Sequence, residues 1–279
     1  MTVRIVTDST CDLPHDTVER LGITVVPLTI FFGDEALLDG VELEAQAFYE
    51  RLQGLGPMPR TSQPSVDLFQ DAYERLSADG SEIVSIHLSS KLSGTLNAAS
   101  VAREVVKASA HVDLIDSYQV SVGLGLIVME AAIAAQAGKG LAEVVAAARR
   151  AMDRTGVYVV VDTLEFLRRG GRLGRARSFL GSILSIKPIL HVEDGEVAPL
   201  ERVRTRARAV ERLYQLALQH PRTKTLFVGY GGESAQAELL AERLRPALPH
   251  TEILLTELGP AVGVHTGPGS LGIAYLERE

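Results

Sequence analysis

Two segments rich in hydroxyl side chains stand just before predicted helices, where side chains and backbone amides can meet a ligand. Residues 61–65 read Thr-Ser-Gln-Pro-Ser, and residues 89–95 read Ser-Ser-Lys-Leu-Ser-Gly-Thr. The second segment follows a buried strand, and ligands bind at the carboxyl ends of strands in open α/β sheets. Its amides would also face an anion favourably at a helix N-terminus. A capped turn is the simpler interpretation of the first segment and an equal alternative for the second.

A glycine-rich segment near the C-terminus matches a nucleotide-binding pattern in spacing only. Residues 267–272, Gly-Pro-Gly-Ser-Leu-Gly, fit G-x-G-x-x-G. The genuine fingerprint follows a strand, opens a helix and has an acidic residue about 20 positions further on. Here the chain ends at Glu279, too soon for that acidic residue. We therefore expect a turn that holds backbone amides near a ligand, and no nucleotide cofactor.

Potential metal ligands are scattered along the chain. No Walker A, H-E-x-x-H or C-x-x-C pattern occurs, and the 7 histidines show no ligand spacing. Asp8, Asp12 and Asp39 lie near predicted strand ends and turns, where carboxylates commonly form caps and turns. The sequence therefore predicts no metal site and no other cofactor.

An arginine-rich segment interrupts an otherwise acidic chain. Residues 168–177 contain five arginines, three glycines and no acidic residue, whereas the whole chain has a net charge of −7. Such a run usually forms a solvated face. A guanidinium group also suits bidentate contact with phosphate or carboxylate. We therefore predict that this segment, and Arg172 above all, docks a partner. The competing interpretation is an internal salt bridge of Arg172 that locks two domains together.

The elements that must position these segments alternate regularly in the first half of the chain. Short runs rich in Val and Ile indicate strands of a parallel sheet that helices cover on both faces. The expected strands are 3–8, 23–30, 82–88 and 112–116. The expected helices are 43–52, 66–76, 95–107, 120–137 and 141–152, with Ser65 at the N-cap position of the second.

The second half of the chain shows a different pattern. Strands 189–192 and 197–203 flank Asp194-Gly195 and predict a hairpin. The other expected elements are strands 157–161, 226–230 and 253–257 and helices 206–219 and 235–244. A hairpin among βα units implies a mixed sheet. We place a domain boundary near residue 156, giving domains 1–156 and 157–279. No linker tract separates them, so we expect them to pack tightly around a ligand cleft.

Composition restricts the class of protein. The 279 residues are 46% hydrophobic and 23% charged, as in ordinary globular domains. The net charge of −7 argues against a general attraction to nucleic acid or to an anionic membrane. The most apolar stretch, 120–137, contains Glu130 and predicts a buried helix, not a membrane span. With one cysteine, Cys11, and no visible signal peptide, we expect a cytoplasmic protein without an integral membrane segment.

Six segments together resemble the DegV family of bacterial fatty-acid-binding proteins. They occur in the family's order across nearly the whole chain. The resemblance implies an α/β fold with an N-terminal three-layer α/β/α domain around a parallel sheet. It also implies a C-terminal two-layer α/β domain with a mixed sheet, a fold shared with dihydroxyacetone kinase subunits. The six segments are residues 8–12, 61–65, 89–95, 164–172, 187–188 and 265–272.

The resemblance also implies a ligand and a partner. In family members the carboxylate of a long-chain fatty acid, such as palmitate or oleate, meets hydroxyls that map onto Thr61 and Ser93, with His265 nearby. The tail is expected to lie in an apolar tunnel. Some members present the acid to a separate ATP-dependent fatty-acid kinase, which makes an acyl phosphate. This chain would then be a non-catalytic lipid-binding subunit. The residues expected to support the head-group site are Ser62, Gly94, Thr95 and Gly267.

Physical chemistry is consistent with that function. Burying a methylene contributes about 0.8 kcal/mol, so a tail of about 16 carbons would supply roughly 10 kcal/mol before ordering costs. Neutral hydroxyls can then orient the carboxylate without burying a second charge. The alternative is a serine hydrolase or small-acid transferase that uses Ser93 and His265, for which the sequence shows no obvious orienting acid.

Overall fold

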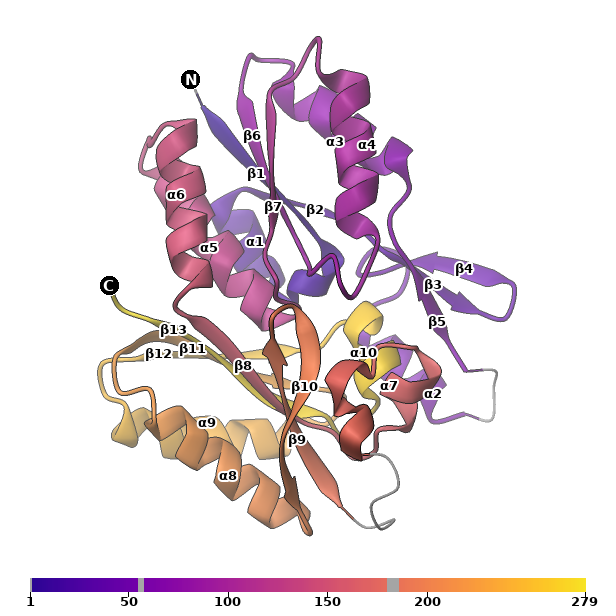
Figure 1. Cartoon of the computed structure of the whole chain (residues 1–279), viewed down its shortest axis with the longest axis vertical. Helices are drawn as coiled ribbons and strands as arrows, with labels where there is room; N and C mark the ends of the chain where they lie inside the picture. Colours follow the sequence, from indigo (N-terminus) through magenta and orange to yellow (C-terminus); the bar gives the residue numbers. More distant parts are fainter. Residues whose placement is uncertain (1, 55–57, 180–185) are drawn as a thin grey trace.

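The first half of the chain folds into a parallel sheet enclosed by helices on both faces (Figure 1). The computed structural model describes residues 2–54, 58–179 and 186–279. The strand order is β2-β1-β6-β7, and each neighbouring pair is parallel. Most side chains of β1 and β6 are buried, which accounts for their Val and Ile content. The bounds are Val3–Asp8 for β1, Ile23–Val26 for β2, Glu82–His87 for β6 and Val112–Asp116 for β7.

Two layers of helices cover this sheet. One face packs against α3 and α4, and the other against α1, α5 and α6. The N-cap predicted at Ser65 is present, because its Oγ accepts a hydrogen bond from Leu68 N at 3.3 Å. The prediction of a three-layer α/β/α unit is therefore confirmed. The helices are α1 His15–Leu21, α3 Val66–Ser77, α4 Thr95–Val106, α5 Val122–Gln136 and α6 Leu141–Met152.

The second half forms a six-stranded mixed sheet with the order β10-β9-β8-β13-β11-β12. β11 and β12 pair in parallel, and the other neighbours are antiparallel. Helices α8 (Arg206–Leu218) and α9 (Ala235–Ala247) cover one face, which confirms the two-layer prediction. The strands are β8 Thr155–Val160, β9 Lys187–Glu193, β10 Glu196–Val203, β11 Thr223–Tyr230, β12 Glu252–Glu257 and β13 Leu271–Glu277.

The predicted hairpin is present between β9 and β10. Its two turn residues, Asp194 and Gly195, have φ values of 50° and 79°. Positive φ at both positions is what a two-residue hairpin turn requires, because that twist matches the flanking strands. The hairpin tip reaches the first unit, where Ser89 Oγ donates to the carbonyl oxygen of Gly195 at 2.7 Å.

Helix α5 lies between the two sheets and is apolar on nearly all sides for that reason. Its buried side chains pack with Val157, Phe227 and Ala274 of the mixed sheet as well as with strands of its own sheet. The face of the mixed sheet that α8 and α9 leave open is thus covered by a helix of the first unit. The predicted helix over 120–137 is confirmed as buried, and it begins at Val122.

The prediction of a single strand over residues 23–30 is wrong. The chain leaves the parallel sheet after Val26, and β3 (Thr29–Phe32) belongs to a separate antiparallel sheet with β4 (Glu35–Leu38) and β5 (Arg60–Ser62). Pro27 explains the break, because proline has no amide to continue a ladder. The amide of Leu28 then donates to Ser9 Oγ at 3.0 Å instead of to a strand. Helix α2 (Ala45–Leu52) packs beside this small sheet.

Several short elements also differ from the expectation. The glycine-rich segment 267–272 follows helix α10 (Pro260–Thr266) and leads into β13. This order is the reverse of a strand-to-helix nucleotide fingerprint. A further short helix, α7 (Glu165–Arg169), precedes the arginine-rich segment, and 3-10 turns occupy Ser9–Cys11 and Gly174–Phe179. No helix in the described part of the chain is long and apolar enough to span a membrane.

Candidate functional site

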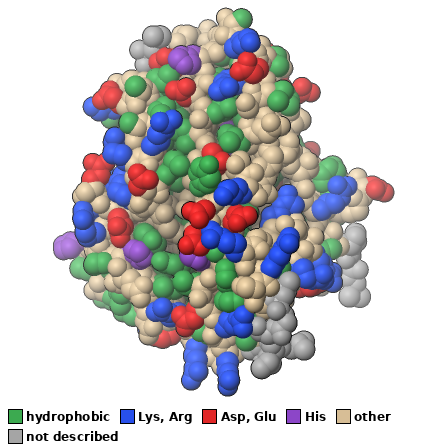
Figure 2. Space-filling view, in the orientation of Figure 1, with side chains coloured by type: hydrophobic (Ala, Val, Ile, Leu, Met, Phe, Trp, Pro, Cys, Tyr) green, Lys and Arg blue, Asp and Glu red, His purple; other side chains and the backbone are tan. Residues whose placement is uncertain are grey.

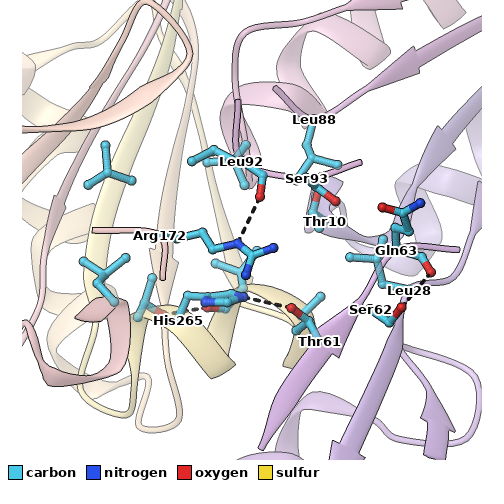
Figure 3. A pocket seen from close by; sticks show the side chains of 16 residues that line it. Thr10, Leu28, Thr61, Ser62, Gln63, Leu88, Leu92, Ser93, Arg172 and His265 are labelled. Atoms are coloured by element: carbon cyan, nitrogen blue, oxygen red, sulfur yellow. Dashed lines mark hydrogen bonds between the residues drawn. The ribbon is translucent and has the colours of Figure 1, made fainter. Parts of the chain in front are cut away.

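A cleft of about 360 Å³ opens where the two sheets and the small antiparallel sheet meet. The loops after β1 and β6, strand β5, the segment after α7 and helix α10 all contribute side chains to it (Figure 3). Among its 16 lining residues, Arg172 is the one side chain with a fixed charge. The remaining polar lining groups are hydroxyls, an amide and an imidazole, so the cleft is suited to a single anionic group.

Thr61 and His265 meet across this cleft although they lie 204 positions apart in the chain. Thr61 is on β5 and His265 is in the last turn of α10, and Thr61 Oγ1 lies 2.9 Å from His265 Nε2. Burial and the nearby positive charge of Arg172 lower the pKa of His265 to about 4. The imidazole is therefore neutral at pH 7, and any positive charge in the cleft comes from Arg172.

The second ring nitrogen of His265 fixes the direction of this hydrogen bond. His265 Nδ1 is buried and has no partner among the described residues. A buried N–H without an acceptor is rarer than an unpaired lone pair, so the proton belongs on Nε2. Nε2–H then donates to Thr61 Oγ1. The hydroxyl proton of Thr61 is consequently free to point at an anion in the cleft.

Gly170 provides the space in which His265 sits. A Cβ atom at this position would lie 2.1 Å from His265 Nδ1. The carbonyl oxygen of Gly170 also accepts a hydrogen bond from Arg172 Nη1 at 2.8 Å. Gly170 therefore shapes the cleft around His265 and Arg172.

Ser93 lies on the loop between β6 and α4 and lines the same cleft. Its Oγ is 2.9 Å from Thr95 Oγ1 and accepts a hydrogen bond from Thr95 N at 3.3 Å. Gly94 allows this loop to touch segment 61–65, because a Cβ there would lie 2.0 Å from Gln63 Oε1. The two hydroxyl-rich segments of the sequence thus converge on one cavity. Ser62 lies at its exposed edge, and its Oγ is 3.4 Å from the carbonyl oxygen of Gln63.

The structure places Gly267 beneath the cleft, where it supports α10. Its φ is 75°, and a Cβ would lie 2.4 Å from the ring of Phe166 on α7. Gly267 therefore allows α7 and α10 to pack closely. This contact keeps His265 beside the arginine-rich segment.

Arg172 is half-buried and bridges the two units of the molecule. Its Nε donates to the carbonyl oxygen of Leu92 at 3.0 Å, and its guanidinium group faces the cleft beside His265 (Figure 3). Within the described residues, both hydrogen-bond partners of Arg172 are carbonyl oxygens, so the bridge is not the salt bridge considered above. Docking of a partner by Arg172 stays a prediction, and the structure also places Arg172 in the lining of the cleft, which the sequence did not reveal.

Three of the other four arginines of this segment have acidic neighbours. Arg168 and Arg169 both pair with Glu165, at 2.7 Å and 2.5 Å. Arg175 lies within 3.7 Å of carboxylates of the hairpin strands and turn. Basic and acidic side chains accordingly lie next to one another over the hairpin and α7 (Figure 2). The segment is basic in sequence but largely neutralised in space.

Asp8 ties the ends of β1 and β6 together beneath the cleft. Its Oδ2 accepts from Leu88 N and lies 3.0 Å from His87 Nδ1, while Oδ1 accepts from Thr10 N and Thr10 Oγ1. Thr10 and Leu88 both line the cleft. The carboxylate therefore positions two walls of the site.

The hydrogen-bond chain continues from His87 into the core. His87 Nε2 is 2.7 Å from Ser85 Oγ, which is 2.8 Å from Tyr73 OH. This Asp-His-Ser sequence of contacts has the connectivity of a catalytic triad. Asp8, His87 and Ser85 are each 0% exposed, so no substrate reaches them. This chain of hydrogen bonds therefore has a structural role.

Two further buried carboxylates hold the N-terminus of α10. Asp12 Oδ1 accepts from Gly259 N at 2.9 Å, and Asp12 Oδ2 accepts from Ser121 Oγ at 2.5 Å. Burial raises the pKa of Asp12 well above its usual value. Burial likewise raises the pKa of Asp39, whose carboxylate lies beside Gly259 at the start of the same helix, to about 7. These carboxylates anchor the helix that carries His265.

An apolar channel leads on from the cleft. Five residues line both cavities, and the channel runs between the open face of the mixed sheet and the start of α5. Its walls include Val157, Val159 and Val161 of the mixed-sheet unit and Val122 of α5. The residues common to both cavities are Val120, Leu167, Val197, Val262 and Thr266. A ligand can therefore place a polar end in the cleft and an apolar end in the channel.

The arrangement does not provide a paired nucleophile and base. Ser93 bonds to Thr95, whereas His265 bonds to Thr61. The remaining nitrogen of His265 abuts Gly170, not a carboxylate. Within residues 2–54, 58–179 and 186–279, no group of three or more His, Cys, Asp and Glu side chains is arranged to hold a metal ion.

Fold and cleft together define an α/β protein with a ligand-sized cavity between a parallel-sheet unit and a mixed-sheet unit. The chain belongs to the DegV family, whose sequence model, described as "Uncharacterised protein, DegV family", matches residues 2–278. It is 41% identical over 280 residues to a DegV domain-containing protein of Streptomyces coelicolor, covering 99% of each chain. It is 34% identical over 280 residues to Protein DegV of Bacillus subtilis, again covering 99% of each chain.

Three solved structures of similar fold are described in terms of fatty-acid binding. A DegV family protein from Thermus thermophilus, titled for fatty acid binding, is similar with a TM-score of 0.91, 33% identity and full coverage of both chains. DegV of Bacillus subtilis, titled a fatty acid binding protein, has a TM-score of 0.92, 32% identity and full coverage of both. A stearic-acid-binding protein from Eubacterium ventriosum has a TM-score of 0.92 and 25% identity, covering 99% of this chain and 98% of the other. The predicted family and fold class are confirmed.

Proposed function

We propose that this chain binds one long-chain fatty acid, such as palmitate or oleate, with its carboxylate in the cleft and its tail in the apolar channel. The observation that carries the proposal is the continuity of the two cavities. One fixed positive charge and several neutral donors lie at one end, and aliphatic side chains line the other. The fatty-acid-binding titles of similar structures support the same ligand class.

The head group is held by Thr61, Ser93 and Arg172, with His265 as an indirect contributor. His265 orients Thr61, because it donates to Thr61 Oγ1 and leaves the hydroxyl proton available. Arg172 compensates the negative charge, and two carbonyl oxygens hold its guanidinium in place. Affinity then comes mainly from the tail, because each buried methylene contributes about 0.8 kcal/mol.

The chain acts as a carrier in this proposal, and it presents its ligand to a separate ATP-dependent fatty-acid kinase. Ser62 and Gln63 line the cleft and are exposed, so the polar end of the ligand lies near solvent. A carboxylate oxygen at that position is open to phosphoryl transfer, while the channel keeps the tail out of water. Acyl phosphate should form when kinase, ATP, Mg²⁺ and the loaded protein are combined, and not when the protein is omitted.

Binding is favoured over hydrolysis because Ser93 lacks an activating base in contact with it. A fluorophosphonate probe is expected to leave Ser93 unlabelled. Stoichiometric labelling of Ser93, located by peptide mapping, would support the serine hydrolase instead.

Native mass spectrometry of protein purified without added lipid is the central test. We expect an adduct of fatty-acid mass that organic extraction removes. The extracted protein should then bind palmitate at micromolar concentration and bind hexadecanol more weakly, because only the acid compensates Arg172. A delipidated, folded protein that takes up neither palmitate nor oleate would refute the proposed function.

A further inference from the structure

Two glycines lie side by side on the floor of the apolar channel. Gly229 of β11 and Gly272 of β13 are paired in register, and Gly272 is paired with Val159 on its other side. All three residues line the channel. Along the same strands, Phe227 and Ala274 are two residues away from these glycines and pack toward α5. Because side chains alternate between faces, a side chain at 229 or 272 would project into the channel.

Backbone conformation does not require glycine at either position. Neither Gly229 nor Gly272 is among the residues with positive φ in the described chain. Both lie inside strands, where glycine weakens the sheet because it has no side chain to pack. Glycine at positions 229 and 272 therefore leaves room in the channel above these strands. Glycine inside a strand often marks a site where another backbone or a ligand approaches closely.

The two positions differ in how tightly they are enclosed. A Cβ at Gly229 would lie 3.0 Å from Leu258 Cδ2 and 3.9 Å from Val122 Cγ2, both of them channel side chains. A Cβ at Gly272 would lie 3.0 Å from the backbone oxygen of Tyr158. Only the flexible end of Leu258 must move for alanine at 229, whereas backbone must move for alanine at 272. Gly229 is therefore the position at which the floor can be raised without disturbing the sheet.

We propose that the Gly229–Gly272 pair sets the depth of the acyl channel and thereby the longest fatty-acid chain that the protein accepts. The inference rests on the proposed function, because it assumes that the channel holds an acyl tail. A side chain at 229 shortens the channel and leaves the head-group cleft unchanged. The effect is a change in chain-length preference, not a general loss of binding.

The test compares Gly229→Ala and Gly229→Val with wild type in competition for an equimolar mixture of saturated acids from 12 to 20 carbons. Bound acids are identified by native mass spectrometry. Each methylene that the raised floor excludes should cost about fourfold in affinity, the equivalent of about 0.8 kcal/mol. The valine variant should lose the longest acids first and keep the 12-carbon acid. The alanine variant should show the same trend to a smaller degree.

Val228→Ile is the matched control, because Val228 neighbours Gly229 but packs on the opposite face of the sheet. It should retain the wild-type preference even if it lowers the melting temperature. If Gly229→Val does not fold, Gly229→Ala carries the test. An equal loss for all chain lengths, or an unchanged preference in a folded Gly229→Ala variant that binds acids, would overturn the inference. Failure of wild type to bind any fatty acid would instead refute the proposed function.

Discussion

The two ends of the ligand cavity are built in opposite ways. At the cleft, side chains from both halves of the chain are fixed by hydrogen bonds, as between Thr61 and His265 and between Arg172 and Leu92. At the channel, Gly229 and Gly272 line the cavity without contributing side chains to it. Orientation of a ligand therefore depends on groups that are present, whereas its length depends on groups that are missing.

This difference predicts different responses to mutation. A cleft held by a connected polar network should lose stability or head-group affinity when one member is removed. Substitutions at the small residues of the channel should change stability little and should change which ligands bind. The variants below test this contrast, beginning with the largest expected effect.

Asp8→Ala should cause the largest loss of stability. The substitution leaves His87 without its carboxylate partner and the amides of Thr10 and Leu88 without their acceptor. Each buried donor that is left without an acceptor typically costs about 1–3 kcal/mol. Urea unfolding measures the change. Glu35→Ala is the control, because Glu35 pairs with Arg51 at an exposed site, where the expected cost is small. Equal effects of the two variants would contradict the anchoring role of Asp8.

Arg172→Gln should have the next largest effect, this time on the ligand. A hydrogen bond to a charged group contributes about 1.5–3 kcal/mol, so palmitate affinity should fall by roughly 10- to 100-fold. Affinity for hexadecanol should change little, because the alcohol carries no charge. Isothermal titration of delipidated protein measures both.

Arg175→Gln is the matched control for charge, because Arg175 lies in the same segment but pairs with Glu193 and Asp194. It should keep wild-type palmitate affinity. Unchanged palmitate affinity in Arg172→Gln, together with weaker acyl-phosphate formation with the kinase, would favour the docking role over the head-group role.

The ability to predict each end from sequence follows the same division. Segment 89–95 could be singled out from its own residues, because hydroxyls that follow a buried strand and precede a helix leave a local signal. Thr61 and His265 were expected only from the resemblance to a family. The role of Gly170 was not predictable, because it depends on His265, which the fold brings from 95 positions further along the chain. His87 left no signal at all, since its partner Asp8 comes from another strand and Tyr73, which contacts its other partner Ser85, comes from a helix.

The fold itself was largely predictable where local patterns are long. Strands rich in Val and Ile and the Asp194-Gly195 turn identified both sheets. The prediction failed at residues 23–30, where Pro27 divides two strands of different sheets. It also missed α10 and β13, because a seven-residue helix shows too little periodicity and β13 follows a run of glycines. The sequence contains both channel glycines, but it does not show that Gly229 and Gly272 pair in register, because that depends on the tertiary structure.

Ser93→Ala should lower palmitate affinity moderately, by roughly tenfold, because one hydrogen bond to the carboxylate is lost while the tail still binds. The chain-length preference should remain that of wild type, in contrast with Gly229→Val. Competition among acids of different length measures this in one experiment. A changed length preference in Ser93→Ala would break the separation between the two ends of the cavity.

The smallest expected effect concerns the anchor of α10 and its dependence on pH. Burial raises the pKa of Asp39 to about 7 in the folded protein, whereas the ordinary value is 3.8. The folded state therefore binds a proton more readily than the unfolded chain. The contribution of Asp39 to stability is fully present below pH 4 and is lost as the pH rises through 7. Between pH 6 and pH 8 the free energy of unfolding should fall by about 1.4 kcal/mol on account of Asp39.

His265 contributes with the opposite sign, because its pKa is lowered to about 4 and its contribution is lost as the pH falls from its ordinary value of 6.5. The informative quantity is therefore the difference in the free energy of unfolding between wild type and Asp39→Asn. Both proteins contain His265, so its contribution cancels in this difference. Urea unfolding at pH 6, 7 and 8 should show that the free energy of unfolding of wild type falls by about 1.4 kcal/mol relative to that of Asp39→Asn as the pH rises from 6 to 8. Asp71→Asn, at an exposed position on α3, should show no such shift. A pH-independent difference for Asp39→Asn would mean that Asp39 keeps one protonation state over this range, so that the anchor of α10, and with it His265, is insensitive to pH.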